Sequence, residues 1–401
     1  MATTIDTSHS HLTHKLKSFL LITSLILPLL LFAYTAYTSY GYDDEIFNIV
    51  NAQPEKYVSA YELIQDHLSG KIIDIHPVGS FLMNYILLKT LGSWNLVRVV
   101  GGVLSALAMW LYWRYVVIKG KTDTMTVIFA YVFMCLNPAV LMWCTGLRWQ
   151  TYAFPLICVL GFILSQPPYL SSRKYLFWGS YFLTASIIFY TETSAAIMIL
   201  ASFIMLLIHR RKYFIDEWQT IFLFGILALV IVSRQIYIFL TVFWPDVQGS
   251  NEFYSMIQAV SGGGQNFLCG QGVLPVSLPG IILIAANLVL FLVFMLNIKT
   301  IASSCTNGFF MLSYAGIILT TIGGKIRNFV ALSAPHGGFM TDTFALIKSR
   351  ALKKTVLALY IVGTIWGVCH VASHNDTTRA TWNTPYGELM EFLEQYNSNV
   401  G

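Results

Sequence analysis

The chain has 401 residues, of which 56% are hydrophobic and 11% are charged, and its formal net charge is +5. Because a soluble protein carries about 25% charged residues, this composition excludes an ordinary soluble enzyme. The basic residues form short scattered clusters, a pattern that argues against nucleic acid as a partner. Several apolar runs approach the ~20 residues that a helix needs to cross a bilayer.

The apolar runs predict an all-α polytopic membrane protein, since helices satisfy their own backbone groups in lipid. The first run is too long for a signal peptide and no cleavage site follows it, so it is expected to be retained. We expect about eleven transmembrane helices between a tail at 1–17 and a second tail at 373–401. The predicted spans are Ser18–Tyr40, Leu96–Ile118, Met125–Thr145, Tyr152–Leu164, Tyr175–Tyr190, Ser194–Ile208, Thr220–Phe243, Leu278–Asn297, Phe309–Ile322, Asn328–Leu346 and Thr355–Val371.

One further apolar run, Val78–Leu91, is shorter and contains Asn84 and Lys89. Runs of this length are typical of interfacial segments. If this run does not cross and the N-terminus is cytoplasmic, most basic residues fall on the cytoplasmic side, as the positive-inside rule requires. The loops 41–95 and 244–277 then lie outside. We therefore expect a multi-pass protein of a bacterial inner membrane whose juxtamembrane first loop faces the periplasm, with membrane lipids as its surroundings.

Three carboxylates follow the first span, at Asp43, Asp44 and Glu45. Like charges this close raise the pKa of one of the group, which suits a general base for an acceptor hydroxyl. By themselves these residues are also explained as the N-terminal cap of a juxtamembrane helix.

A second polar group, Asp74 and His76, stands directly before Pro77. An acid and a histidine two residues apart in a turn can face one cavity, where the histidine can hydrogen-bond a phosphate or the acceptor. The alternative is a helix cap with proline in the first turn of Val78–Leu91.

Cations and one more carboxylate are predicted on the same outer face. Arg148, Lys325 and Arg327 can hold a phosphate, although Arg148 is equally explained by snorkelling to the membrane surface. Glu192 stands between two spans, and a carboxylate this close to lipid is a functional candidate. A carboxylate base beside a cationic clamp fits transfer from a lipid phosphate donor.

Three motifs between Gly41 and Arg98 resemble the integral-membrane glycosyltransferases of the GT-C superfamily, near the protein O-mannosyltransferase and aminoarabinose-transferase branch. Weaker matches lie at Asn137-Pro138 with Arg148, at Tyr190-Thr191-Glu192, where Glu replaces the usual His, and at Arg327-Asn328-Phe329. The three stronger motifs are Tyr42-Asp43-Asp44-Glu45, Asp74-Ile75-His76-Pro77-Val78 and Gly92-Ser93-Trp94-Asn95-Leu96-Val97-Arg98.

The resemblance implies a GT-C-like catalytic domain over 18–372 and an inverting transfer of sugar from a polyprenyl-phosphate donor. It makes Asp44 the base, with Asp43 as its nearest rival, and gives Arg148 and Arg327 to the leaving phosphate. The acceptor implied is a cell-envelope glycan, an O-antigen or a lipid-linked saccharide. Some members use a divalent metal ion and others do not; the sequence shows no metal-ligand spacing, so no cofactor is assigned.

Two alternatives stay open. A glycan polymerase or ligase would use the same outer face. A lipid-linked glycan flippase or other transporter would place its charges near the middle of the bilayer.

Overall fold

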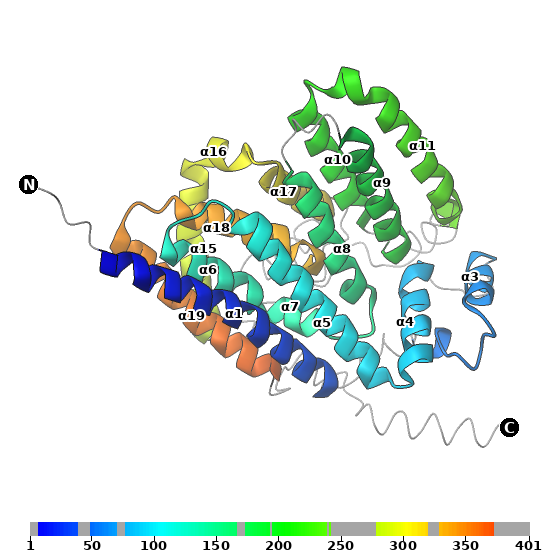
Figure 1. Ribbon diagram of the computed structural model, residues 1–401, viewed down its shortest axis with the longest axis horizontal. Helices are drawn as coiled ribbons and strands as arrows, with labels where there is room; N and C mark the ends of the chain where they lie inside the picture. The colour runs from blue at the N-terminus through cyan, green and yellow to red at the C-terminus, as the bar shows by residue number, and fades with distance from the viewer. Residues whose placement is uncertain are drawn as a thin grey trace, which may run out of the picture.

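The computed structural model describes residues 7–38, 49–69, 77–166, 173–192, 195–238, 240–241, 278–319 and 329–372, and every regular element in these ranges is helical (Figure 1). The predicted all-α class is therefore confirmed for them. The longer helices are α1 (Thr7–Thr38), α3 (Ala60–Leu68), α4 (Val78–Leu91), α5 (Trp94–Tyr112), α6 (Thr124–Cys135), α7 (Pro138–Trp143), α8 (Trp149–Leu164), α9 (Lys174–Thr191), α10 (Ala196–Arg210), α11 (Phe214–Ile238), α15 (Leu278–Leu296), α17 (Cys305–Leu319), α18 (Ser333–Ala345) and α19 (Arg350–Ala372). Short turns complete them: a π-helical turn (Trp113–Val117), α16 (Ile298–Ala302) and a 3-10 turn (Val330–Leu332).

Four helical segments are long and apolar enough to cross a membrane: Trp94–Val117, Thr124–Trp143, Phe214–Ile238 and Arg350–Cys369. Six shorter apolar helices of 10–17 residues accompany them, α4 among them. Large apolar side chains such as those of Leu229 and Val230 on α11 are exposed. A wide exposed apolar surface is typical of a face that meets lipid.

Each predicted span overlaps a helix, with one correction. The run Met125–Thr145, expected as one helix, is divided into α6 and α7 at Asn137-Pro138. Proline has no backbone N–H to continue the helix. The Asn137 side chain caps the new helix instead, because its Oδ1 accepts hydrogen bonds from the backbone N–H groups of Ala139 (3.0 Å) and Val140 (3.2 Å).

Helices α6 and α8 form the centre of the bundle, and most of their side chains are buried. Aromatic packing joins the centre to its neighbours: the ring of Phe129 on α6 is stacked on Phe344 of α18, with centroids 4.2 Å apart. Cys135, Cys144 and Cys158 are buried and free, as expected of thiols that act as small hydrophobic residues. This core holds the ends of the helices in fixed positions.

A second, smaller core lies at one end of the bundle, which we call the α4 end. It is made by 49–63, α4 and the first turn of α5, with Phe81, Tyr85 and Trp94 among its buried residues. The segment α3 is held to the bundle by Arg234 of α11, whose guanidinium donates to the carbonyl oxygen of Leu68, the last residue of α3. Such a contact satisfies a carbonyl that the helix end leaves free.

At the opposite end of the bundle, ion pairs join the loops. Lys121 Nζ lies 2.5 Å from Asp342 Oδ1, and Arg210 Nη2 lies 2.6 Å from Glu217 Oε1. Burial alone would raise the pKa of Asp123, but hydrogen bonds from Lys353 and Thr126 outweigh it and hold that pKa below its ordinary value. The basic clusters that the charge pattern assigned to one side of the membrane thus gather at one end of the molecule. The basic clusters concerned, all within the described residues, are Arg114–Lys121, Arg173/Lys174, Arg210–Lys212, Lys299 and Lys348–Lys354.

Candidate functional site at the α4 end

The helix α4 begins directly after the predicted Asp74-His76 segment. Its first residues approach the end of α9 so closely that a Cβ atom at Gly79 would lie 2.5 Å from the carbonyl oxygen of Tyr190. A side chain at position 79 would therefore collide with backbone, and glycine is the residue that permits the approach. Through this contact α4 lies against the end of α9 that leads into Glu192.

Asn84, one and a half turns further along α4, connects this helix to the start of α8. The Asn84 amide donates to the carbonyl oxygen of Leu147 (3.3 Å) and accepts from the hydroxyl of Tyr152 (2.5 Å). Asn84 and Tyr152 are buried, so these bonds are shielded from water and specify one position of the chain. Leu147 directly precedes Arg148, and Asn84 thus positions that arginine.

Arg148 and Glu192 are both buried, with 4% and 8% of their surface exposed. Arg148 stands in extended conformation at the N-terminus of α8, and Glu192 stands in extended conformation at the C-terminus of α9. Burial of this degree is rare for charged residues unless they are paired or functional. The snorkelling alternative for Arg148 is wrong, because its side chain does not extend into solvent.

A second buried arginine, Arg98 on α5, is fully enclosed. Helices α5 and α8 run parallel: Gly101 meets Thr151 near their starts, and Tyr112 meets Gly161 further along. Arg98 precedes Gly101 by three residues and Arg148 precedes Thr151 by three, so the two arginines lie at the same level of the bundle.

The same level is reached by the end of α1, which runs antiparallel to α5. Ser24 accepts a hydrogen bond from Trp110 (3.1 Å), and a Cβ at Gly102 would lie 3.2 Å from the carbonyl oxygen of Phe32. Arg98 lies one turn before Gly102 in α5. Because α1 runs antiparallel, Arg98 is therefore level with Thr38, where α1 ends. Figure 1 shows the end of α1, the start of α5 and α4 together at this end of the molecule.

Seven of the predicted site residues lie outside the described residues: Asp43, Asp44, Glu45, Asp74, His76, Lys325 and Arg327. The chain nevertheless enters the segment of Asp43–Glu45 and leaves the segment of Asp74–His76 at the α4 end. Asp43 follows Thr38 by five residues, and His76 directly precedes Pro77 at the start of α4. Arg327 precedes Phe329 by two residues, and Phe329 packs its ring 5.3 Å from that of Tyr314 on α17.

Arg98, Asn84 and Tyr152 are absent from the predicted site residues. The indication in the sequence was a polar side chain within an apolar run, as at Asn84 in Val78–Leu91 and Arg98 in Leu96–Ile118. Among the residues that the structure describes, no three His, Cys, Asp or Glu side chains come together as metal ligands.

The buried side chains at this end, two arginines and a glutamate, are of the kinds that recognise anions. Two buried guanidinium groups at one level repel each other unless negative charge lies with them. Carboxylates and phosphate oxygens are their best partners, because the planar guanidinium binds both in a bidentate manner.

No protein-family model, no curated protein and no solved structure gives a significant match to this chain.

Proposed function

We propose that the protein is a GT-C-like membrane glycosyltransferase that moves a sugar from a polyprenyl-phosphate donor to a cell-envelope glycan or a lipid-linked acceptor. The observation that carries the proposal is the meeting of charged groups at the α4 end. Buried Arg98, Arg148 and Glu192 lie at the level where the chain enters the segments of Asp43–Glu45 and Asp74–His76. Such a grouping of cations and carboxylates is what transfer from a phosphate donor needs.

The reaction is a single displacement with inversion. Asp44 accepts the proton of an acceptor hydroxyl as its oxygen attacks the anomeric carbon of the donor, and the bond from that carbon to the phosphate oxygen breaks. The leaving polyprenyl phosphate carries the developing negative charge. Arg148 and Arg327, with Lys325, stabilise that charge, while Asp74, His76 and Glu192 orient the acceptor and the phosphate.

The proposed setting is a bacterial inner membrane crossed about eleven times, with the α4 end facing the periplasm. Polyprenyl carriers are lipids, so the hydrocarbon chain of the donor can stay in the bilayer beside the apolar faces of the helices. The charged groups described above lie at the ends of helices, whereas a transporter would hold its substrate near the middle of the membrane. The arrangement therefore favours an enzyme over a flippase.

The test is a transfer assay with purified protein and a polyprenyl-phosphate hexose. Replacing the base by its amide, Asp44→Asn, should lower the rate of transfer by about 100-fold or more, as general-base removal does. Glu55→Gln serves as a matched control, because Glu55 is an exposed carboxylate at the same end. Transfer by Asp44→Asn at the wild-type rate would exclude Asp44 as the base, and the same result for Asp43→Asn would reject the carboxylate mechanism.

A further inference from the structure

A cavity of about 310 Å³ lies at the end of the bundle opposite to α4. Helices α5, α8, α10, α17 and α18 supply its walls. Its polar lining includes Lys119, Lys121 and Arg210, and the hydroxyl groups of Ser304 and Thr306 at the start of α17. From Arg98 to Lys119 the chain rises by about 1.5 Å per residue, which is roughly 30 Å in all, so this cavity is separate from the site proposed above.

The lining carries an excess of positive charge. Asp342 is the acidic residue among those that line it, and it is paired with Lys121 and accepts a hydrogen bond from Asn307 (2.8 Å). Arg210 is paired with Glu217. Lys119 is exposed and makes no ion pair within the part of the chain that the structure describes. An anion that enters this cavity thus meets a cation that is not yet neutralised.

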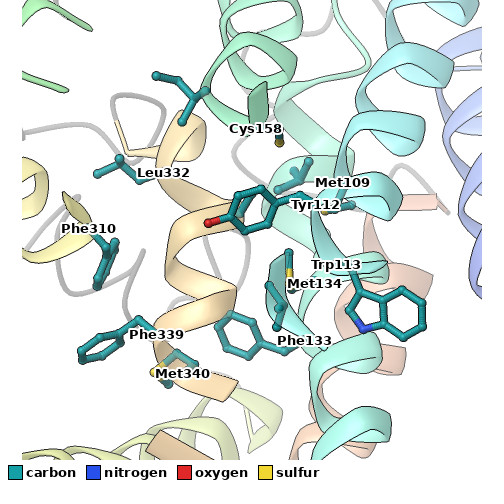
Figure 2. Packing of buried hydrophobic residues seen from close by; sticks show 14 of the residues in the cluster. Met109, Tyr112, Trp113, Phe133, Met134, Cys158, Phe310, Leu332, Phe339 and Met340 are labelled. Atoms are coloured by element: carbon teal, nitrogen blue, oxygen red, sulfur yellow. The ribbon is translucent and has the colours of Figure 1, made fainter. Parts of the chain in front are cut away.

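Tyr112 gives an independent indication of a ligand. Its side chain lines the cavity and is 2% exposed, and its hydroxyl makes no hydrogen bond within the described residues. Figure 2 shows Tyr112 among the buried residues Met109, Cys158 and Leu332, with the hydroxyl directed away from α5. A buried hydroxyl without a partner is unfavourable, because it has lost its hydrogen bonds to water. A ligand oxygen in the cavity would remove that cost.

We propose that this cavity is a binding site for a phosphate ester. The phosphate is held by Lys119 and Lys121 at the mouth, by Ser304 and Thr306 and the free N–H groups of the first turn of α17, and by the Tyr112 hydroxyl at the inner wall. Helix N-termini favour anions because their N–H groups point outward. The volume is that of a pocket for a small ligand, and apolar Val117 and Leu206 in the lining leave room for an organic group.

The phosphate can belong to a soluble ester or to the headgroup of an anionic phospholipid. Basic pockets between membrane helices bind such headgroups. Equilibrium dialysis of the full chain in an uncharged detergent against radiolabelled inorganic phosphate measures the first. Native mass spectrometry of the same protein with phosphatidic acid, against phosphatidylcholine, measures the second.

The decisive variants are Lys119→Gln and Tyr112→Phe. Tyr112→Phe removes one hydroxyl that has no hydrogen-bond partner among the described residues, so it should leave folding unchanged. It should weaken binding about tenfold, as loss of a hydrogen bond to a charged group does. Lys119→Gln should weaken it at least as much. The control is Lys348→Gln, which removes an exposed lysine at the same end that does not line the cavity.

Each outcome decides the proposal. Retention of inorganic phosphate that both variants weaken and the control does not would support a soluble ester. Retention of phosphatidic acid over phosphatidylcholine with the same dependence would support a lipid headgroup. If neither probe is retained, or if Tyr112→Phe and Lys119→Gln behave like Lys348→Gln, the site does not exist.

Discussion

At the scale of single residues, the clearest device is Asn84 in the apolar helix α4. Its amide joins Tyr152 and the carbonyl of Leu147. We predict that Asn84→Leu destabilises the protein, since it removes the two buried hydrogen bonds of Asn84, worth about 0.5–1.5 kcal/mol each. It should also lower sugar transfer, because Asn84 holds the carbonyl of Leu147, the residue directly before Arg148, in place. Thermal unfolding in detergent and the transfer assay measure the two effects.

Tyr152→Phe is the matched control for that change, since it removes the hydroxyl and leaves the Leu147 carbonyl paired with Asn84. Its loss of stability should be smaller than that of Asn84→Leu. Equal stability and equal transfer in Asn84→Leu and wild type would show that this contact positions nothing.

At the scale of single residues, a charge at the junction of two apolar runs is the pattern from which the sequence predicts site residues. Arg148 and Glu192 follow this pattern and both are buried at the α4 end, and their roles stay predictions. Arg98 and Asn84 were not selected, because each lies within an apolar run, where a lone polar residue can face a neighbouring helix, a cavity or the lipid headgroups. For Arg98, the parallel alignment of α5 and α8 decides which of these surroundings the side chain meets. The hydrophobic periodicity of the sequence does not predict that alignment.

At the scale of helices, the packing of α4 against α9 depends on Gly79. A methyl group there would lie 2.5 Å from a backbone oxygen that cannot rotate away. We predict that Gly79→Ala displaces the start of α4 and lowers sugar transfer at least tenfold, with lower thermal stability. Gly225→Ala is the control, because its added carbon meets the nearest atom of Phe182 at 3.5 Å, an ordinary contact. Equal transfer by the two variants would contradict this role of Gly79.

Helix boundaries could be predicted where proline or glycine marks them. The run Val78–Leu91 is the helix α4, bounded by Pro77 and by Gly92, whose φ of 67° allows the left-handed end of a helix. The break at Asn137-Pro138 was missed within Met125–Thr145, because hydropathy averages across a single proline. The level at which helices meet follows from close approaches such as that of Gly102 to α1, which depend on contacts between segments far apart in the chain.

At the scale of the whole molecule, the decisive question is whether α4 crosses the membrane. Both anchors of α4 are at the ends of other helices: Gly79 meets the last turn of α9, and Asn84 meets the residue before Arg148. At 14 residues and about 1.5 Å per residue, α4 is also shorter than the ~30 Å hydrocarbon layer. We therefore expect α4 to lie at the membrane surface rather than to cross the bilayer.

We therefore predict an odd number of crossings, with the two termini on opposite sides and the loop around Gly120 on the side of the N-terminus. An epitope tag placed at the N-terminus, at Gly120 or at the C-terminus of the full chain is probed with antibody in intact and permeabilised spheroplasts. The C-terminal tag should react in intact spheroplasts, and the other two should react after permeabilisation alone. If α4 crosses, the Gly120 tag becomes accessible in intact spheroplasts and the C-terminal tag does not. That exchange would move the basic clusters beside Arg210 and Lys353 outside, against the positive-inside rule, so the same measurement tests the charge argument and the placement of α4 together.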